Sequence, residues 1–240
     1  MNYFAHGRAW LDDPYYLAGT AVPDWLNVSD RGVRVRARQA AAWIDDADPP
    51  LAALARGIVQ HHHDDAWFHD TAAFNELQWR LAAMIRATLG PDDSLRPSFL
   101  GHVLVEVLLD AALVVEEPSL LDDYYAAMAA VDAATVERGV NRMAARPCAR
   151  LAWFIEAFSA ERFLYDYADD GKLWFRMNQV MRRVGLPALP ENFTSLLPEA
   201  RRLVTEQRHR LTTAPLADAM PLHSTPLHST PSPSTTSHPG

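Results

Sequence analysis

Residues 51–70 read LAALARGIVQHHHDDAWFHD, and this stretch decides the fold. Two prolines precede it, and proline favours the first turn of a helix. Apolar residues recur at helical spacing through Leu51, Leu54 and Ile58. The stretch therefore predicts a long helix with one buried face, and the same pattern type recurs on both sides of it.

Helical patterns cover most of the chain, because Ala, Leu, Arg and Glu dominate and β-branched runs are short. No segment alternates apolar and polar residues between hairpin turns, so we expect no sheet. Thr71 and Asp132 are expected helix N-caps. The sequence predicts an all-α, single compact multi-helix domain over residues 1–212, with further helices at 72–89, 99–117, 120–131, 133–145, 148–168, 171–184 and 198–210.

The last residues have a different composition. From Pro215 the chain reads PLADAMPLHSTPLHSTPSPSTTSHPG, in which PLHST occurs twice. Proline and hydroxyl residues dominate, and such a segment buries too little apolar surface to offset the entropy of ordering it. We predict that residues 213–240 form a disordered tail rich in Pro, Ser, Thr and His.

Composition excludes several classes of protein. The formal net charge of −8 disfavours non-specific binding to nucleic acid. The single cysteine, Cys148, excludes an internal disulfide framework and a cysteine-based zinc site. No run of about 20 uninterrupted apolar residues and no signal-peptide pattern is visible, so we expect no membrane partner and a cytoplasmic location.

Histidines and carboxylates occupy one face of the helix at 51–70. His61, Asp65 and His69 are spaced by four residues, so they lie above one another on successive turns. They continue the apolar stripe that contains Ile58, and such a ladder can bind one or two divalent metal ions. The alternative is a solvated polar patch, which three adjacent histidines form more often than a metal site.

A second ladder lies in the most apolar predicted helix, at 99–117. Its polar residues are His102, Glu106 and Asp110, again at a spacing of four. Buried charges must be paired or bound to metal, so the ladder indicates a second set of ligands, with Asp110 expected outside the ligands themselves. A narrow solvent-facing stripe is the alternative.

Other candidate residues have weaker local signals. His6 and Asp24 stand near the start of the chain, where His6 could be an ordinary surface or hydrogen-bonded histidine and Asp24 a helix N-cap. Arginines can hold phosphate with forked hydrogen bonds or balance acidic neighbours on a solvated face. The candidates form two groups in the sequence: Arg31, Arg34, Arg36 and Arg38, and Arg176, Arg182 and Arg183.

Several motifs resemble those of the acyl-carrier-protein phosphodiesterases. The opening, residues 1–6, reads MNYFAH, and Gly57-Ile58 precedes His61, Asp65 and His69 without a gap. Residues 19–24, 159–169 and 178–183 are similar to the family in the same order. Three features depart from the family: His69 stands at an Asp position, the Asn of a Gly-Asn pair is missing, and the later helix carries a different His/carboxylate pattern.

The resemblance implies an all-helical fold related to the HD-type metal phosphohydrolases. It also implies a divalent metal, with manganese first and zinc, iron or magnesium as the other candidates, and a phosphoester substrate linked to a carrier protein. His6, Asp24, His61, Asp65 and the His69 position would be ligands.

Two functions follow from the sequence. The first is a metal-dependent phosphodiesterase in which activated water attacks a phosphoester. Its metal ligands would include His102 and Glu106 as well, Asp65 and Asp64 would be catalytic, and Arg176 and Arg182 would bind phosphate. The second is a non-catalytic helical binding module, or a degenerate enzyme, with solvated ladders. The sequence assigns no oligomeric state.

Overall fold

The computed structural model describes residues 1–90 and 93–213, and within these ranges the chain is helical and contains no strand. The predicted all-α class is confirmed, whereas residues 214–240 of the predicted tail lie outside the described residues. The α-helices are α1 Tyr3–Gly7, α2 Pro14–Ser29, α3 Ala37–Ala40, α4 Pro49–Asp70, α5 Ala72–Leu89, α6 Pro97–Glu116, α7 Pro118–Ala129, α8 Ala133–Met143, α9 Leu151–Glu161, α10 Asp170–Val184 and α11 Leu197–Thr212. The 3₁₀ helices are η1 Ala41–Trp43, η2 Asp93–Leu95, η3 Phe163–Ala168 and η4 Glu191–Leu196.

Local sequence explains where these helices begin. Proline occupies the first turn of α2, α4, α6, α7 and α11, where the missing N–H costs no hydrogen bond. The predicted caps are present: Thr71 accepts the N–H of Phe74 at 3.2 Å, and Asp132 accepts that of Thr135 at 3.2 Å.

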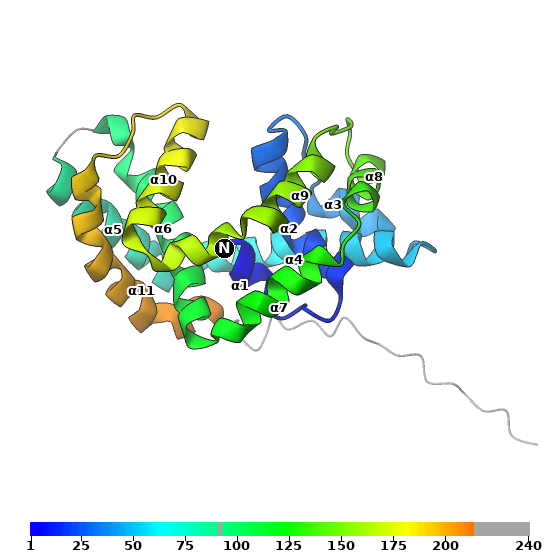
Figure 1. The fold of residues 1–240 in the computed structure, drawn as a ribbon, viewed down its shortest axis with the longest axis horizontal. Helices are drawn as coiled ribbons and strands as arrows, with labels where there is room; N and C mark the ends of the chain where they lie inside the picture. Colours follow the sequence, from blue (N-terminus) through cyan, green and yellow to red (C-terminus); the bar gives the residue numbers. More distant parts are fainter. Residues whose placement is uncertain (91–92, 214–240) are drawn as a thin grey trace, which may run out of the picture.

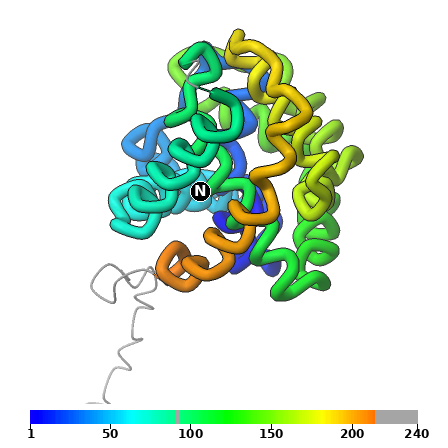
Figure 2. The backbone as a smooth tube through the Cα atoms, turned by 90° about the vertical axis from the view of Figure 1, so that its left-hand side faces the viewer, coloured from blue at the N-terminus to red at the C-terminus, as the bar shows by residue number. Residues whose placement is uncertain are grey.

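The helices form two groups with α1 between them. Figure 1 shows α5, α6, α10 and α11 on one side and α2, α3, α8 and α9 on the other, with α4 passing between. Figure 2, turned by 90°, again places the start of the chain near the middle of the molecule. Phe4 and Tyr3 of α1 are accordingly buried in the core. The first residues of the chain therefore lie where both groups of helices can contact them.

Helix α6 is the most apolar helix of the described residues. By length and composition alone it could cross a membrane, but 56% of its apolar window is buried inside the protein. It packs against α5 and α11, and Leu100, Leu104 and Leu109 are fully buried. Two of its polar residues contact neighbouring helices: Asp110 bonds α1, and Glu106 contacts His69 of α4.

One predicted helix is wrong. The segment 148–168 is not continuous, because Arg162 adopts a left-handed backbone with φ of 47°. Helix α9 ends there and the 3₁₀ helix η3 follows, which buries Leu164 and Tyr167. Arg162 lies over the ring of Tyr125 and bonds Asp122 at 2.8 Å, so contacts with α7 oppose the intrinsic helical preference of the segment.

Candidate metal centre

Six of the predicted residues form two adjacent groups of ligands. In the first group, ligand atoms of His6, His61 and Asp65 lie within 4.8 Å of one another. In the second group, ligand atoms of His69, His102 and Glu106 do the same. Helix α4 contributes to both groups, since His61, Asp65 and His69 lie on successive turns as predicted. Each group offers two imidazoles and one carboxylate, a donor set that suits divalent transition metals.

A close crossing of α2 and α4 positions His61. A Cβ on Gly57 would lie 2.8 Å from the Cα of Gly19, so glycine at both positions lets the two backbones touch. The crossing brings the carbonyl oxygen of Thr20 to 2.8 Å from Nδ1 of His61. Nδ1–H donates to this carbonyl, which leaves Nε2 as the free nitrogen, 3.4 Å from Asp65.

Two carboxylates hold His6 in place. Asp110 is fully buried and accepts the backbone N–H groups of Phe4, at 3.1 Å, and Ala5, at 2.8 Å. It thereby caps the N-terminus of the short helix that carries His6. Asp64 lies 3.2 Å from Nδ1 of His6, so Nε2 is the nitrogen that faces Asp65.

Nε2 of His6 faces the carboxylate of Asp65 without a well-formed hydrogen bond. It is buried, lies 3.2 Å from Asp65, and makes no hydrogen bond of acceptable angle to any described atom. A buried polar atom without a hydrogen bond is costly unless another ligand satisfies it. The orphaned nitrogen, the free Nε2 of His61 and the carboxylate of Asp65 therefore fit a metal ion.

The ionisable side chains of the first group strongly perturb one another's pKa values. Burial lowers the pKa of His6, but the carboxylates of Asp64 and Asp65 outweigh it and raise that pKa to about 9. Burial raises the pKa of Asp65, but contacts with His6 and His61 outweigh it and keep the pKa well below the usual range. Asp65 is therefore ionised, and His6 carries a proton at neutral pH while no metal is bound.

Glu106 organises the second group. Its Oε1 lies 3.1 Å from Nε2 of His69 and 3.3 Å from Nε2 of His102. Burial alone would raise the pKa of Glu106, but the amino group of Met1 and the two imidazoles lower it. The rings of His69 and His102 both pack against Phe74.

The amino group of Met1 joins the two groups. Its nitrogen lies 2.6 Å from Asp65 and 3.4 Å from Glu106. Burial lowers the pKa of this amine, but the two carboxylates reverse the effect and raise it. The two groups thus converge on one point, where a positive charge is electrostatically favoured.

Asp24 lies beside the ligands and not at a helix end. It is inside α2, directly after Pro23, and Asp13 is the N-cap of that helix. The alternative of an N-cap at Asp24 is therefore wrong. Burial raises the pKa of Asp24, although the charges of His61 and His6 oppose this. Asp24 is electrostatically coupled to the site but belongs to neither group of three.

The remaining predicted residues lie around the site or away from it. His62 contacts the carbonyl oxygen of Val35 at 2.9 Å, and His63 is exposed. Arg176 is paired with Asp166 at 2.7 Å and Glu161 at 2.9 Å.

The site borders a cavity of about 620 Å³. Residues of α2 and α9 and of α6 and α10 line this cavity. Figure 1 shows the first two helices in one group and the last two in the other. The cavity lining includes two carboxylates, Asp24 and Glu106, and four arginines, Arg31, Arg34, Arg176 and Arg183. Arg182, the other predicted phosphate ligand, is exposed and is not among its lining residues.

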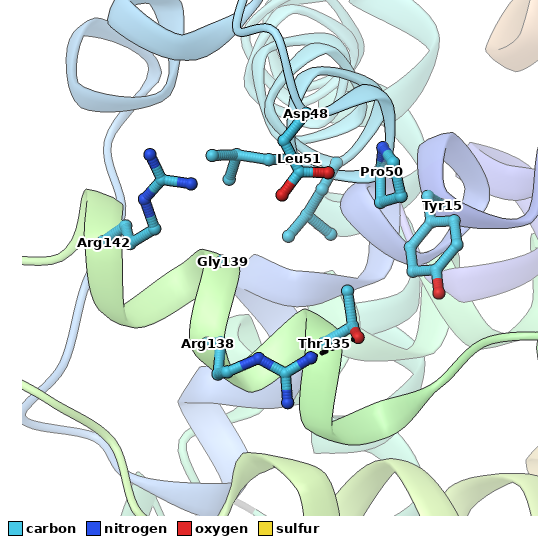
Figure 3. A pocket seen from close by; sticks show the side chains of 9 residues that line it. Tyr15, Asp48, Pro50, Leu51, Thr135, Arg138, Gly139 and Arg142 are labelled. Atoms are coloured by element: carbon cyan, nitrogen blue, oxygen red, sulfur yellow. Dashed lines mark hydrogen bonds between the residues drawn. The ribbon is translucent and has the colours of Figure 1, made fainter.

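A second cavity, of about 270 Å³, is lined by residues at the start of α4 and on α8. Figure 3 shows Arg138 and Arg142 on α8 at this cavity, with Arg138 hydrogen-bonded to Thr135 at 2.6 Å. Both arginines are exposed and already contact acidic residues, Asp132 and Asp46. None of the residues of the two ligand groups lines this second cavity.

Sequence reasoning missed three parts of the site. The Thr20 carbonyl has no sequence signal, because a carbonyl group occurs at every residue. No local pattern links the Met1 amine with Asp65 and Glu106, which are distant in the sequence. The Gly19–Gly57 contact did have a signal, because both glycines lie within helices. Glycine inside a helix lowers stability, so its presence there indicates a close packing contact.

No family model matches the chain, and no curated protein or solved structure matches it either. The geometry of the site is therefore the basis for inferring a function.

Proposed function

We propose that this protein is a divalent-metal-dependent hydrolase of phosphoesters, and of phosphodiesters in particular. The observation that carries the proposal is the pair of adjacent ligand groups, one of which contains the orphaned buried Nε2 of His6. The neighbouring arginine-lined cavity supplies room and positive charge for a substrate. When bound, divalent ions would lower the pKa of a water ligand and polarise a phosphoryl oxygen.

The residues of the chain have distinct roles in this proposal. His6, His61 and Asp65 hold one ion, and His69, His102 and Glu106 hold another. Thr20 and Asp64 orient the imidazoles through their Nδ1 atoms, which is how metal-binding histidines are commonly fixed. Asp24, beside both groups, is placed to accept a proton from water or to complete a ligand set.

The resemblance to the acyl-carrier-protein phosphodiesterases belongs to the proposal as well. It supports an HD-type phosphohydrolase fold, manganese as the first metal to test, a carrier-protein-linked phosphoester and a cytoplasmic location. Of the residues that carry the resemblance, His6, His61 and Asp65 lie in one group, and His69 lies in the next.

The test starts from full-length protein stripped of metal with a chelator. Mn²⁺ is added back, and hydrolysis of bis(p-nitrophenyl) phosphate is followed by the absorbance of p-nitrophenolate. We expect hydrolysis only with metal, and a loss of at least about 100-fold in kcat/KM for Asp65→Asn. A second arm measures, by mass spectrometry, whether a holo-carrier protein loses its phosphopantetheine group.

His63→Ala is the matched control, because His63 lies on the same helix but is exposed and outside both groups. Hydrolysis that survives Asp65→Asn would contradict the proposal. Metal binding without hydrolysis of either substrate would favour the binding-module alternative.

A further inference from the structure

The cavity beside the ligand groups has a polar inner end and an apolar wall. Asn2, Asp24 and Glu106 line it near the ligands. The wall consists of aromatic and aliphatic side chains from α6, α9, η3 and α10, namely Phe99, Val103, Val107, Phe154, Phe163, Leu173, Met177 and Val180. Apolar side chains make no favourable contact with metal ions or phosphate oxygens. The wall therefore indicates that the ligand has an apolar part.

Three arginines of this cavity have no carboxylate partner. Arg31, Arg34 and Arg183 are exposed, and none of them forms an ion pair with an acidic side chain of the described residues. Arg176, in contrast, is neutralised by Asp166 and Glu161. Because Arg31, Arg34 and Arg183 also line the cavity, their guanidinium groups are available to an anion bound there.

Arg31 and Arg183 meet although they are far apart in the sequence. The guanidinium of Arg31 donates to the backbone carbonyl oxygen of Arg183, and the residues follow α2 and end α10, respectively. The charge of Arg183 also acts on the buried Tyr3, whose pKa it lowers against the larger effect of burial. Arg183 and Arg31 both line the cavity, so the two residues lie at the same part of its wall.

We propose that the substrate is a small phosphoester that carries an aromatic or other bulky apolar group and a second anionic group. The phosphoester lies at the ligand groups, the apolar group lies against Phe99 and Phe154, and the second anion contacts Arg31 and Arg183. This inference rests on the proposed function for the position of the phosphoester. The cavity volume suits a small molecule or the end of a flexible arm.

The test measures binding, so it does not depend on turnover. Three phosphodiesters that share one methyl ester are titrated into Mn²⁺-loaded full-length protein by calorimetry: dimethyl phosphate, methyl phenyl phosphate and methyl 4-carboxyphenyl phosphate. We expect the phenyl ester to bind about tenfold more tightly than the dimethyl ester. The carboxyl group is expected to add about fivefold or more.

Variants separate the two contributions. Arg183→Ala and Arg31→Ala should remove the gain from the carboxyl group and keep the gain from the ring. Phe154→Leu should weaken the gain from the ring. The controls are Arg182→Ala and Trp153→Ala. Arg182 directly precedes Arg183, Trp153 directly precedes Phe154, and both are exposed and outside the cavity lining.

Equal affinities for the three esters, no binding of any of them, or a carboxyl gain that survives both arginine variants would overturn the inference. A binding preference without hydrolysis of bis(p-nitrophenyl) phosphate would refute the proposed function and support this ligand class. Hydrolysis without the preference would do the reverse.

Discussion

The carboxylate of Asp110 accepts the backbone N–H of Ala5 at 2.8 Å, although 105 residues separate them. A second oxygen of the same carboxylate accepts the N–H of Phe4. Helix α6 thereby caps α1 from outside, since Asn2 makes no capping bond with its own side chain. The position of His6 in the first ligand group depends on this contact between two helices.

Asp110→Asn is predicted to weaken metal binding through His6. An amide offers one acceptor oxygen, so one buried N–H loses its partner at a cost of about 1–2 kcal/mol in the free energy of unfolding. The rise in melting temperature on adding Mn²⁺ should be smaller for Asp110→Asn than for the wild type. This difference should be larger than the lower stability of the metal-free variant accounts for. Unchanged metal stabilisation would show that Asp110 does not position His6.

The stability of the wild type relative to Asp110→Asn should depend on pH. Burial raises the pKa of Asp110 to about 7, so the folded protein holds this proton more tightly than the unfolded chain does. The wild type therefore loses stability relative to the variant as pH rises from about 4 to about 7, and the difference is constant above that. Urea unfolding at pH 5 and pH 8 measures the difference, and Asp123→Asn, at an exposed carboxylate, is the control.

Metal binding is predicted to release a proton near neutral pH. The pKa of His6 is raised to about 9 in the metal-free protein, and a metal ligand must be neutral imidazole. Affinity for Mn²⁺ should therefore rise with pH, by up to about tenfold per pH unit, until about pH 9. Calorimetry in buffers of different ionisation enthalpy counts the protons, and zero release at pH 7 would contradict the assignment of His6 as a ligand.

Glu106→Gln is predicted to reduce the number of bound ions from two to one per chain. Glu106 contributes the only carboxylate of the second group of three, while the first group keeps Asp65. Metal analysis after dialysis against Mn²⁺ measures the ratio. Exposed Glu117, just after the same helix, supplies the control Glu117→Gln, which should bind two ions.

Gly57→Ala is predicted to destabilise the fold and the first ligand group together. The added methyl group would overlap the carbonyl oxygen of Tyr16 and force α2 away from α4, at a cost of about 2 kcal/mol. The contact between Thr20 and His61 would lengthen, so metal affinity should fall as well. Gly171→Ala is the control, because its Cβ would meet only Asp169, at 3.4 Å, in ordinary contact. Equal stabilities of the two variants, by urea unfolding, would contradict the close crossing.

Much of the secondary structure was readable from local patterns. Proline and hydroxyl or acidic caps mark the helix starts, and the predicted range at 51–70 matches α4 closely. The break at Arg162 was not readable, because contacts with Asp122 and Tyr125 of another helix stabilise its left-handed backbone. The spacing of His61, Asp65 and His69 correctly placed them on one face of α4.

The sequence by itself determined the helical class and the two ladders, because helical periodicity is a property of neighbouring residues. Only the tertiary structure decided which ladder residues meet. It divides them into two groups and adds His6 to the first. It also directs Nε2 of His6 and of His61 toward Asp65 through contacts of Thr20, Asp64 and Asp110. These contacts join residues up to 106 positions apart, and no local pattern encodes such distances. Helix packing sets them, above all the approach of α2 to α4 at two glycines.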